Sequence, residues 1–141
     1  RTASKVHGLA GLRVGFAITT PEIAKRMESY LTDSLNIVGL RAAIASYQDE
    51  RFQAFSIEQN NRARKVVTDF LDEKGIQYLD SQANFIFIKT GIQISDFQPG
   101  MEKYGVIVGR PFPPYTDWCR LSMAKPEEME RFNHGFHKVL G

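Results

Sequence analysis

Cysteine and tryptophan are scarce in this sequence of 141 residues, which contains one of each. The lone Cys119 cannot form an intrachain disulfide, which excludes the disulfide-rich secreted class and favours the reducing cytoplasm as the location. No apolar run approaches the roughly 20 residues that cross a bilayer, and the N-terminus lacks a cleavable signal pattern. We therefore expect a cytoplasmic chain with no membrane partner.

A strong excess of charge is also lacking. The 18 Lys and Arg against 16 Asp and Glu give a formal net charge of only +2, and these charges are scattered along the chain. We therefore expect no nucleic-acid partner. With 43% apolar and 11% aromatic residues, the composition is that of a globular chain with one ordinary domain or two small ones. Because it opens at Arg1 in a polar, glycine-spaced stretch, we expect a piece of a longer protein.

The first part of the chain predicts a loop, a strand and a helix. Residues 1–11 are typical of a loop, and Leu12–Thr20 is a short apolar run that favours a buried strand. Pro21 and Glu22 suit the first turn of a helix, and Thr20 is placed to accept a hydrogen bond from a free N–H there.

Two more helices are predicted over 36–47 and 49–74, and Gly75 stands where a glycine commonly ends a helix. So long a run of helices suggests a connection between two structural units. We place the domain boundary near Gly75, dividing 1–74 from 75–141.

Residues 75–141 alternate between short strands and helices, which predicts an α+β layer. The strands are expected over 76–79, 83–89, 106–108 and 118–123, and the helices near 94–104 and over 126–140. Pro99 fits poorly inside a helix, so we expect the first of these helices to begin nearer Gln98 than Ile94.

The densest group of polar side chains lies in residues 1–15. The hydroxyls of Thr2 and Ser4, the amine of Lys5 and the guanidinium of Arg13 are interspersed with three glycines. Glycines let the backbone approach a ligand closely, while hydroxyl and guanidinium groups donate hydrogen bonds to phosphate oxygens. The segment fits neither the P-loop nor the G-x-G-x-x-G pattern. These residues favour an anion-binding loop, with a solvated surface loop as the alternative.

The order of these residues is more specific than their composition. Thr2-x-Ser4-Lys5 is followed by Gly8-Leu9-Ala10-Gly11-Leu12-Arg13-Val14-Gly15, in which Arg13 stands eight residues after Lys5. The segment resembles the Schiff-base lysine segment of fold-type I pyridoxal-phosphate-dependent aminotransferases, most closely the histidinol-phosphate aminotransferase-like branch.

The resemblance implies a role for each polar residue of the segment. Lys5 would form the Schiff base with the aldehyde of pyridoxal 5′-phosphate and then move a proton between the substrate Cα and the cofactor C4′. That chemistry needs an uncharged amine, which desolvation and nearby cationic groups favour. Thr2, Ser4 and Arg13 would hold the cofactor phosphate.

A second match is Trp118-Cys119-Arg120-Leu121-Ser122, which resembles the family's late strand with the arginine that binds the substrate α-carboxylate. Strand alternation places Arg120 on the opposite side from Cys119 and Leu121, so its guanidinium leaves the apolar face. The planar guanidinium can donate two parallel hydrogen bonds to a carboxylate. The alternative for Arg120 is a surface ion pair.

Two further residues are candidates for substrate contact. In histidinol-phosphate aminotransferases, an arginine placed like Arg110 is associated with the distal phosphate of the substrate, but the apolar loop Pro111–Tyr115 also suits an aromatic or apolar side chain. Arg110 could equally be loop surface. Asn84 matches the family's Ala-Asn-Phe and would line the mouth of the site or tie down adjoining backbone.

The histidines and the single cysteine are weaker candidates for functional residues. His134 and His137 lack a third ligand in the pattern, so we predict no metal site. His7 could border the cofactor because it is close to Lys5. Cys119 is interpreted as a small core residue.

The resemblance covers essentially the whole chain but only the last part of such an enzyme. It implies the C-terminal portion of the aspartate-aminotransferase-like fold, in which an α/β remnant of the large domain and the bridging helices (1–74) join a small α+β domain (75–141). The aspartate that pairs with the pyridine nitrogen would lie upstream. Without it the cofactor loses much of its capacity as an electron sink, so we expect this piece alone to be inactive.

We therefore expect part of a homodimeric aminotransferase that transfers an amino group from an amino-acid-like donor to a 2-oxo acid. Histidinol phosphate is the leading donor, and aromatic amino acids come next. One alternative is the aminotransferase-like effector domain of a transcription regulator. Another is a phosphate-binding module that never uses pyridoxal.

Overall fold

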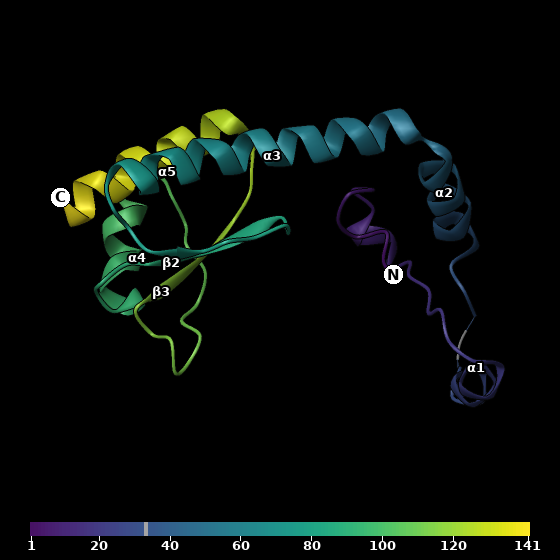
Figure 1. Ribbon diagram of the computed structural model, residues 1–141. Helices are drawn as coiled ribbons and strands as arrows, with labels where there is room; N and C mark the ends of the chain where they lie inside the picture. The colour runs from purple at the N-terminus through teal and green to yellow at the C-terminus, as the bar shows by residue number, and fades with distance from the viewer. Residues whose placement is uncertain (33) are drawn as a thin grey trace. The chain divides into compact units, whose positions relative to one another are not determined.

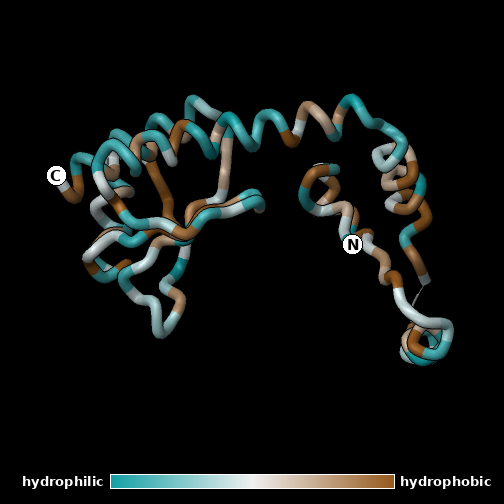
Figure 2. Tube along the Cα trace, viewed as in Figure 1, coloured by the Kyte–Doolittle hydropathy of each residue, from teal (hydrophilic) through white to brown (hydrophobic). Residues whose placement is uncertain are grey.

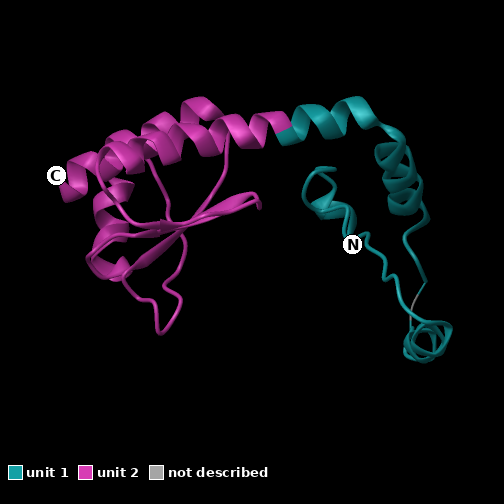
Figure 3. Cartoon of the chain, in the orientation of Figure 1, with its two compact units in different colours: residues 1–57 teal, residues 58–141 magenta. Residues whose placement is uncertain are grey.

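The computed structural model describes residues 1–32 and 34–141, which form two compact units (Figures 1 and 3). Unit 1 comprises residues 1–57 and unit 2 residues 58–141. The division falls within the long third helix, whereas the predicted domain boundary near Gly75 lies just past that helix.

The third helix, α3 (Glu50–Glu73), follows the predicted span closely. Its buried face consists of Ala63, Val67 and Leu71, each 0% exposed and packed into the core of unit 2. Because this apolar stripe recurs at every fourth residue, the C-terminal half of α3 groups with unit 2.

A hydrogen-bonded turn around Gly75 ends α3, as the sequence predicts. Gly75 has a φ of 65°, and its N–H donates to the carbonyl of Asp72 at 3.1 Å. The N–H of Ile76 donates to the carbonyl of Leu71 at 2.8 Å. These two bonds form a Schellman motif, which requires the left-handed backbone that glycine adopts without strain.

Unit 1 contains α1 (Pro21–Glu28) and α2 (Ile37–Gln48) near their predicted positions. Asn36 caps α2, because its Oδ1 accepts a hydrogen bond from the N–H of Gly39 at 3.0 Å. The expected cap of α1 is wrong: the Thr20 side chain accepts no backbone N–H of the first turn. Instead, the backbone N–H of Glu22 and the hydroxyl of Thr20 hydrogen-bond the Glu22 carboxylate and lower its pKa.

The predicted buried strand over Leu12–Thr20 is also wrong. The chain forms the short 3-10 turn η1 (Ala10–Leu12), one isolated bridge between Gly15 and Thr2, and then an extended stretch. Phe16 and Ile18 in this stretch are 46% and 83% exposed. A strand needs a neighbouring strand that satisfies its backbone groups. Among the described residues, the segment around Thr2 pairs with this run at the Gly15 bridge, while Asn36 Nδ2 donates to the carbonyl of Leu12 and the N–H of Ala24 donates to that of Thr20.

Unit 1 has a small core and an extensive exposed apolar surface. Its buried hydrophobic residues are Ala3, Val14 and Ala43. Its exposed large side chains include Ile18, Ile23, Met27, Tyr30, Leu31, Leu35, Ile37, Val38, Ile44, Phe52, Phe55 and Ile57. Exposed apolar surface on this scale is typical of a segment that associates with further protein.

Unit 2 is built on an antiparallel sheet in the order β1 (Tyr78–Leu79), β2 (Phe85–Lys89), β3 (Trp118–Ser122). All three strands lie within their predicted spans. Pairing between β2 and β3 places Phe87 directly opposite Arg120. The sheet therefore brings a β2 aromatic ring and a β3 arginine together on one face.

The fourth predicted strand, Val106–Val108, is wrong because no strand is assigned to this segment. Val108 is nevertheless buried, at 6% exposure. The side-chain amide of Gln98 donates to the carbonyls of Val108 at 3.3 Å and Gly109 at 3.1 Å. A side chain thus satisfies backbone groups that a neighbouring strand would otherwise bind.

Helix α4 (Ile94–Glu102) begins at Ile94 and contains Pro99 in its interior. Our expectation that the helix begins near Gln98 is therefore wrong. Ile94, Phe97 and Met101 are each 0% exposed. Burying three large apolar side chains offsets the one backbone hydrogen bond that proline cannot form, since each contributes about 1.5–3 kcal/mol.

Helix α5 (Pro126–Leu140) has the predicted bounds and buries Met129, Phe132 and Phe136. Hydrophilic and hydrophobic residues are interspersed along α3 and α5, as expected for amphipathic helices (Figure 2). A Cβ built on Gly100 of α4 would lie 2.9 Å from Val139 Cγ1 of α5. Glycine at this position therefore allows the two helices to pack closely.

Candidate functional site

The N-terminal loop, residues 1–15, is folded back on itself by backbone hydrogen bonds. The N–H of Ala3 donates to the carbonyl of Val14 at 3.0 Å, and the N–H of Leu9 donates to the carbonyl of Ala3 at 2.9 Å. Ala3 itself is 0% exposed. The loop is therefore anchored at Ala3, and its polar side chains project from a defined backbone.

Thr2 and Ser4 form a pair of hydroxyls at the start of the loop. Thr2 Oγ1 donates to Ser4 Oγ at 2.8 Å and accepts the backbone N–H of Ser4 at 3.1 Å. Two neighbouring hydroxyls and an N–H thus lie within a single turn, a donor set that suits phosphate oxygens.

Lys5 follows this pair directly and is exposed. Its carbonyl accepts the N–H of Gly8 at 2.9 Å in a tight turn. Gly8 has a φ of 67°, which a residue with a side chain rarely adopts. Among the described residues, no hydrogen bond or ion pair engages the Lys5 amine.

Arg13 has a left-handed backbone, with a φ of 56°. Its guanidinium turns back and donates from Nη1 to the carbonyl of Ala10 at 2.8 Å. The hydrogen bond from the N–H of Ala3 to the carbonyl of Val14 places the segment that follows Arg13 beside the Thr2–Ser4 pair. The loop therefore brings the hydroxyls and this arginine into one backbone framework, while the guanidinium binds within the loop.

His7 has a role that sequence reasoning missed. It is only 5% exposed, its Nδ1 lies 3.0 Å from Ser46 Oγ, and its ring packs on Tyr47 with centroids 4.0 Å apart. His7 thus fastens the loop to α2. No local pattern could have revealed this, because the contact spans 39 residues of sequence.

Strand β3 confirms the predicted alternation. Cys119 and Leu121 are 1% and 7% exposed, whereas Arg120 is exposed on the other face. Burial raises the pKa of the Cys119 thiol to about 12, which keeps it protonated. The interpretation of Cys119 as a core residue therefore fits, and a nucleophilic role does not.

The guanidinium of Arg120 lies over aromatic rings. Its Cζ is 4.5 Å from the centroid of Phe85 and 6.0 Å from that of Phe112. The Cζ of Arg110 is 4.5 Å from the same Phe112 ring. Neither arginine forms a salt bridge with a described residue.

Asn84 lies in the turn before β2, and its side chain is exposed. Its carbonyl accepts the N–H of Met123 at 2.9 Å. The tying of neighbouring backbone that was expected of Asn84 is done by other side chains. Ser81 Oγ donates to the carbonyl of Phe85 at 2.6 Å, and Arg64 Nη1 donates to the carbonyl of Ala83 at 2.7 Å.

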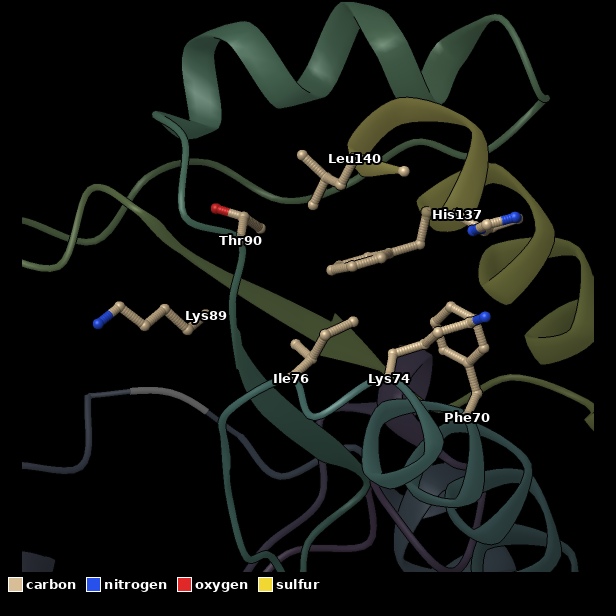
Figure 4. A pocket seen from close by; sticks show the side chains of 9 residues that line it. Phe70, Lys74, Ile76, Lys89, Thr90, His137 and Leu140 are labelled. Carbon is tan, nitrogen blue, oxygen red and sulfur yellow. The ribbon is translucent and has the colours of Figure 1, made fainter.

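A cavity of about 300 Å³ lies between the ends of α3, β2 and α5 (Figure 4). It is lined by Phe70, Lys74, Ile76, Lys89, Thr90, Phe136, His137, Leu140 and Gly141, none of which is a predicted site residue. Within the described residues, no group of three or more His, Cys, Asp or Glu could hold a metal ion. The part of the chain that the structure describes also has no helix long and apolar enough to cross a membrane.

The predicted site residues thus fall into two sets. Thr2, Ser4, Lys5 and Arg13 share the loop of unit 1, whereas Asn84, Arg110 and Arg120 belong to unit 2. Within unit 2 the structure brings Arg110 and Arg120 to one aromatic ring, and Asn84 has no described contact with either.

The family model for aminotransferase class I and II matches residues 1–135. The chain is 35% identical over 144 residues to histidinol-phosphate aminotransferase 2 of Pasteurella multocida (strain Pm70), a match that covers 100% of this chain and 39% of that protein. The chain therefore spans about two fifths of the length of the curated relatives it matches.

Solved structures agree with this match. One from Erwinia carotovora atroseptica SCRI1043 has a TM-score of 0.91 and 35% identity, covering 96% of this chain and 40% of that chain. Histidinol-phosphate aminotransferase from Sinorhizobium meliloti, in complex with pyridoxal-5′-phosphate, has a TM-score of 0.85 and 24% identity, covering 99% and 40%. A mutant aspartate aminotransferase from Thermus thermophilus has a TM-score of 0.78 and 23% identity, covering 99% and 42%. The expected fold class is confirmed.

Proposed function

Because the chain belongs to the aminotransferase class I and II family, we propose that it supplies the cofactor lysine and the substrate-binding arginines of a pyridoxal-phosphate-dependent aminotransferase. The loop geometry supports this proposal most, since Thr2 and Ser4 form a hydroxyl pair immediately before an unpaired Lys5. A relative with 35% identity is a histidinol-phosphate aminotransferase, and we propose the same reaction class for the longer protein that contains this chain.

The residues present fit pyridoxal 5′-phosphate. The cofactor phosphate needs hydroxyl, N–H and guanidinium donors, which Thr2, Ser4 and Arg13 carry within one anchored loop. Its aldehyde needs a primary amine close by, which Lys5 carries. When bound, the cofactor supplies an electron sink for the substrate Cα.

Each of these four residues then has a proposed role toward the cofactor. The hydroxyls of Thr2 and Ser4 and the guanidinium of Arg13 bind the phosphate and fix the position of the cofactor. The amine of Lys5 would hold the cofactor at its aldehyde end and would move the proton at the substrate Cα. Binding a phosphate would require Arg13 to exchange its bond to the Ala10 carbonyl for one to the anion.

Arg120 is proposed to bind the α-carboxylate of an amino-acid donor and of the 2-oxo acid. Its planar guanidinium suits a carboxylate because two N–H groups can bind both oxygens. Asn84 is proposed to line the mouth of the same site. The enzyme is proposed to act as a cytoplasmic homodimer, and the 141-residue piece by itself is proposed to be inactive.

The surroundings of Arg110 are compatible with two kinds of amino donor. A guanidinium over Phe112 is a ligand for a distal phosphate, as in histidinol phosphate. The neighbouring rings of Phe112, Tyr115 and Trp118 would instead suit an aromatic side chain. Half-reactions of the full-length protein with histidinol phosphate, phenylalanine and aspartate distinguish these donors. Arg110→Ala should impair histidinol phosphate far more than phenylalanine.

The central test is covalent trapping. The full-length protein is incubated with pyridoxal phosphate, treated with borohydride and digested, and the labelled peptide is identified by mass spectrometry. We expect the label on Lys5 and none in Lys5→Ala, whereas Lys25→Ala, a matched exposed lysine of α1, should be labelled normally. Labelling that survives Lys5→Ala would overturn the proposal. Labelling on Lys5 without any half-reaction would favour a ligand-sensing domain over an enzyme.

A further inference from the structure

The ring of Phe112 contacts two cationic side chains from different segments. Arg110 belongs to the loop before it and approaches to 4.5 Å, while Arg120 belongs to β3 and approaches to 6.0 Å. Ring faces attract guanidinium groups because their electron density is negative there. Phe112 is the one described aromatic residue within cation–π distance of both arginines.

Phe112 is itself held in place by the sheet. Its ring packs edge-on against Phe87, with centroids 6.0 Å apart and planes at 89°. Phe87 stacks on Trp118 at 5.3 Å and stands opposite Arg120 in the strand pairing. The N–H of Tyr115 donates to the carbonyl of Phe112 at 2.8 Å, which closes the loop around the ring. The ring position is therefore set by β2 and β3.

Aromatic rings, and not carboxylates, contact the guanidinium groups of Arg110 and Arg120. The printed hydrogen bond of Arg110 is a long one, from Nη1 to the carbonyl of Pro111 at 3.4 Å. Arg120 forms no side-chain hydrogen bond within the described chain. A carboxylate partner would orient a guanidinium but would also occupy its N–H donors and cancel its charge. An aromatic face orients the group and leaves the in-plane donors available.

We infer that Phe112 is a positioning residue that sets the spacing of the Arg110 and Arg120 guanidiniums, so that one ligand with two anionic groups can engage both. This inference rests on the proposed function for its biological ligand, but the anion binding it describes can be measured without the cofactor. It assigns Phe112 no contact with the reacting atoms.

The experiment uses the 141-residue chain and two simple probes, glutarate with two carboxylates and butyrate with one. Trp118 is the only tryptophan of the chain and stacks on Phe87 in this cluster, so its fluorescence reports binding. We expect Phe112→Leu, which removes the ring face but keeps an apolar side chain, to weaken glutarate binding about fivefold and butyrate binding less. Phe112→Tyr keeps the face and should bind within about twofold of the wild type.

A merely structural role would behave differently. If Phe112 acts through the arginines, Phe112→Leu should have little further effect in an Arg110→Ala background. Phe55→Leu, an exposed phenylalanine of unit 1, is the matched control and should leave glutarate binding unchanged. Equal losses in Phe112→Leu and Phe112→Tyr, additive losses with Arg110→Ala, or no loss at all would overturn the inference.

This outcome is separable from the proposed function. Lys5→Ala should abolish cofactor labelling of the full-length protein and leave glutarate binding to the chain unchanged. Phe112→Leu should do the reverse, with labelling of Lys5 preserved. In the full-length enzyme, Phe112→Leu should raise KM for a dianionic substrate about fivefold with little change in kcat.

Discussion

The imidazole of His7 lies against the phenol ring of Tyr47, with centroids 4.0 Å apart and planes tilted by 42°. Its Nδ1 also shares a hydrogen bond with Ser46 Oγ. One side chain therefore connects the loop that carries Lys5 to helix α2. The contact adds to the small unit 1 core, in which Ala3 and Val14 of the loop pack with Ala43 of α2.

His7→Ala should loosen the loop without affecting unit 2. The change removes a buried ring contact and a hydrogen bond, which together contribute about 2 kcal/mol. Hydrogen exchange of the backbone N–H groups of Ala3 and Leu9 should become faster, while that of β2 stays the same. The exposed His137 provides the control, and His137→Ala should leave exchange in the loop unchanged. Equal exchange in both variants would contradict this role for His7.

Gly39→Ala should destabilise the chain although alanine is the better helix former. A Cβ at this position would lie 2.9 Å from both Asn36 Nδ2 and Val14 Cγ2, inside the contact between α2 and the loop. We expect a loss of about 1–3 kcal/mol from overpacking, which exceeds the helix-propensity gain of about 1 kcal/mol. Urea unfolding measures the difference. Gly11→Ala, where no atom lies within 4 Å, should have a much smaller effect.

Cys119 should make the stability of the protein fall at alkaline pH. Burial raises its pKa from 9.0 in the unfolded reference to about 12 in the folded chain. Between these values the unfolded state has lost the thiol proton and the folded state keeps it. The free energy of unfolding therefore decreases as pH rises through this window, by at most about 1.4 kcal/mol per pH unit.

Cys119→Ala is the comparison that isolates this effect. Its free energy of unfolding should depend less on pH between 9 and 12 than that of the wild type. The folded wild type should also resist alkylation by iodoacetamide at pH 8 until urea unfolds it. Rapid alkylation of the folded chain would be inconsistent with the burial of the thiol.

Arg120→Lys should reduce kcat/KM of the full-length enzyme about 10- to 100-fold, because lysine lacks the planar pair of donors for a carboxylate. The loss should be similar for phenylalanine and aspartate, since both carry an α-carboxylate, which histidinol phosphate lacks. Arg62→Lys, a charge-preserving change at an exposed position of α3, should have no effect. A loss confined to one donor would instead indicate that Arg120 contacts the variable part of the substrate.

Helix ends were the most predictable part of the fold because their signals are local. Asn36, Gly75 and Pro126 each act within a few residues, and the helices they bound lie where the sequence indicated. Pro99 was misjudged because its cost is local, whereas the compensating burial of Ile94 and Phe97 depends on distant parts of the chain.

Strands were less predictable because pairing depends on partners that a local pattern does not contain. Leu12–Thr20 has the composition of a strand but little to pair with among the described residues, and Val106–Val108 bonds to a glutamine side chain instead of a neighbouring strand. The site residues stood out through the order of the loop and the alternation of β3. The aromatic support of Arg110 and Arg120 by Phe112 did not, because three separate segments create it.

The alternation of β3 makes its length as important as its composition. Cys119 and Leu121 face inward while Arg120 faces outward, so neighbouring positions serve opposite surroundings. Deleting a single residue before Cys119 would shift the register by one and exchange the two sides. The Arg120 guanidinium would then face the apolar interior, and the Cys119 thiol would face solvent. An in-frame deletion of one codon at this point would therefore impair both folding and ligand binding.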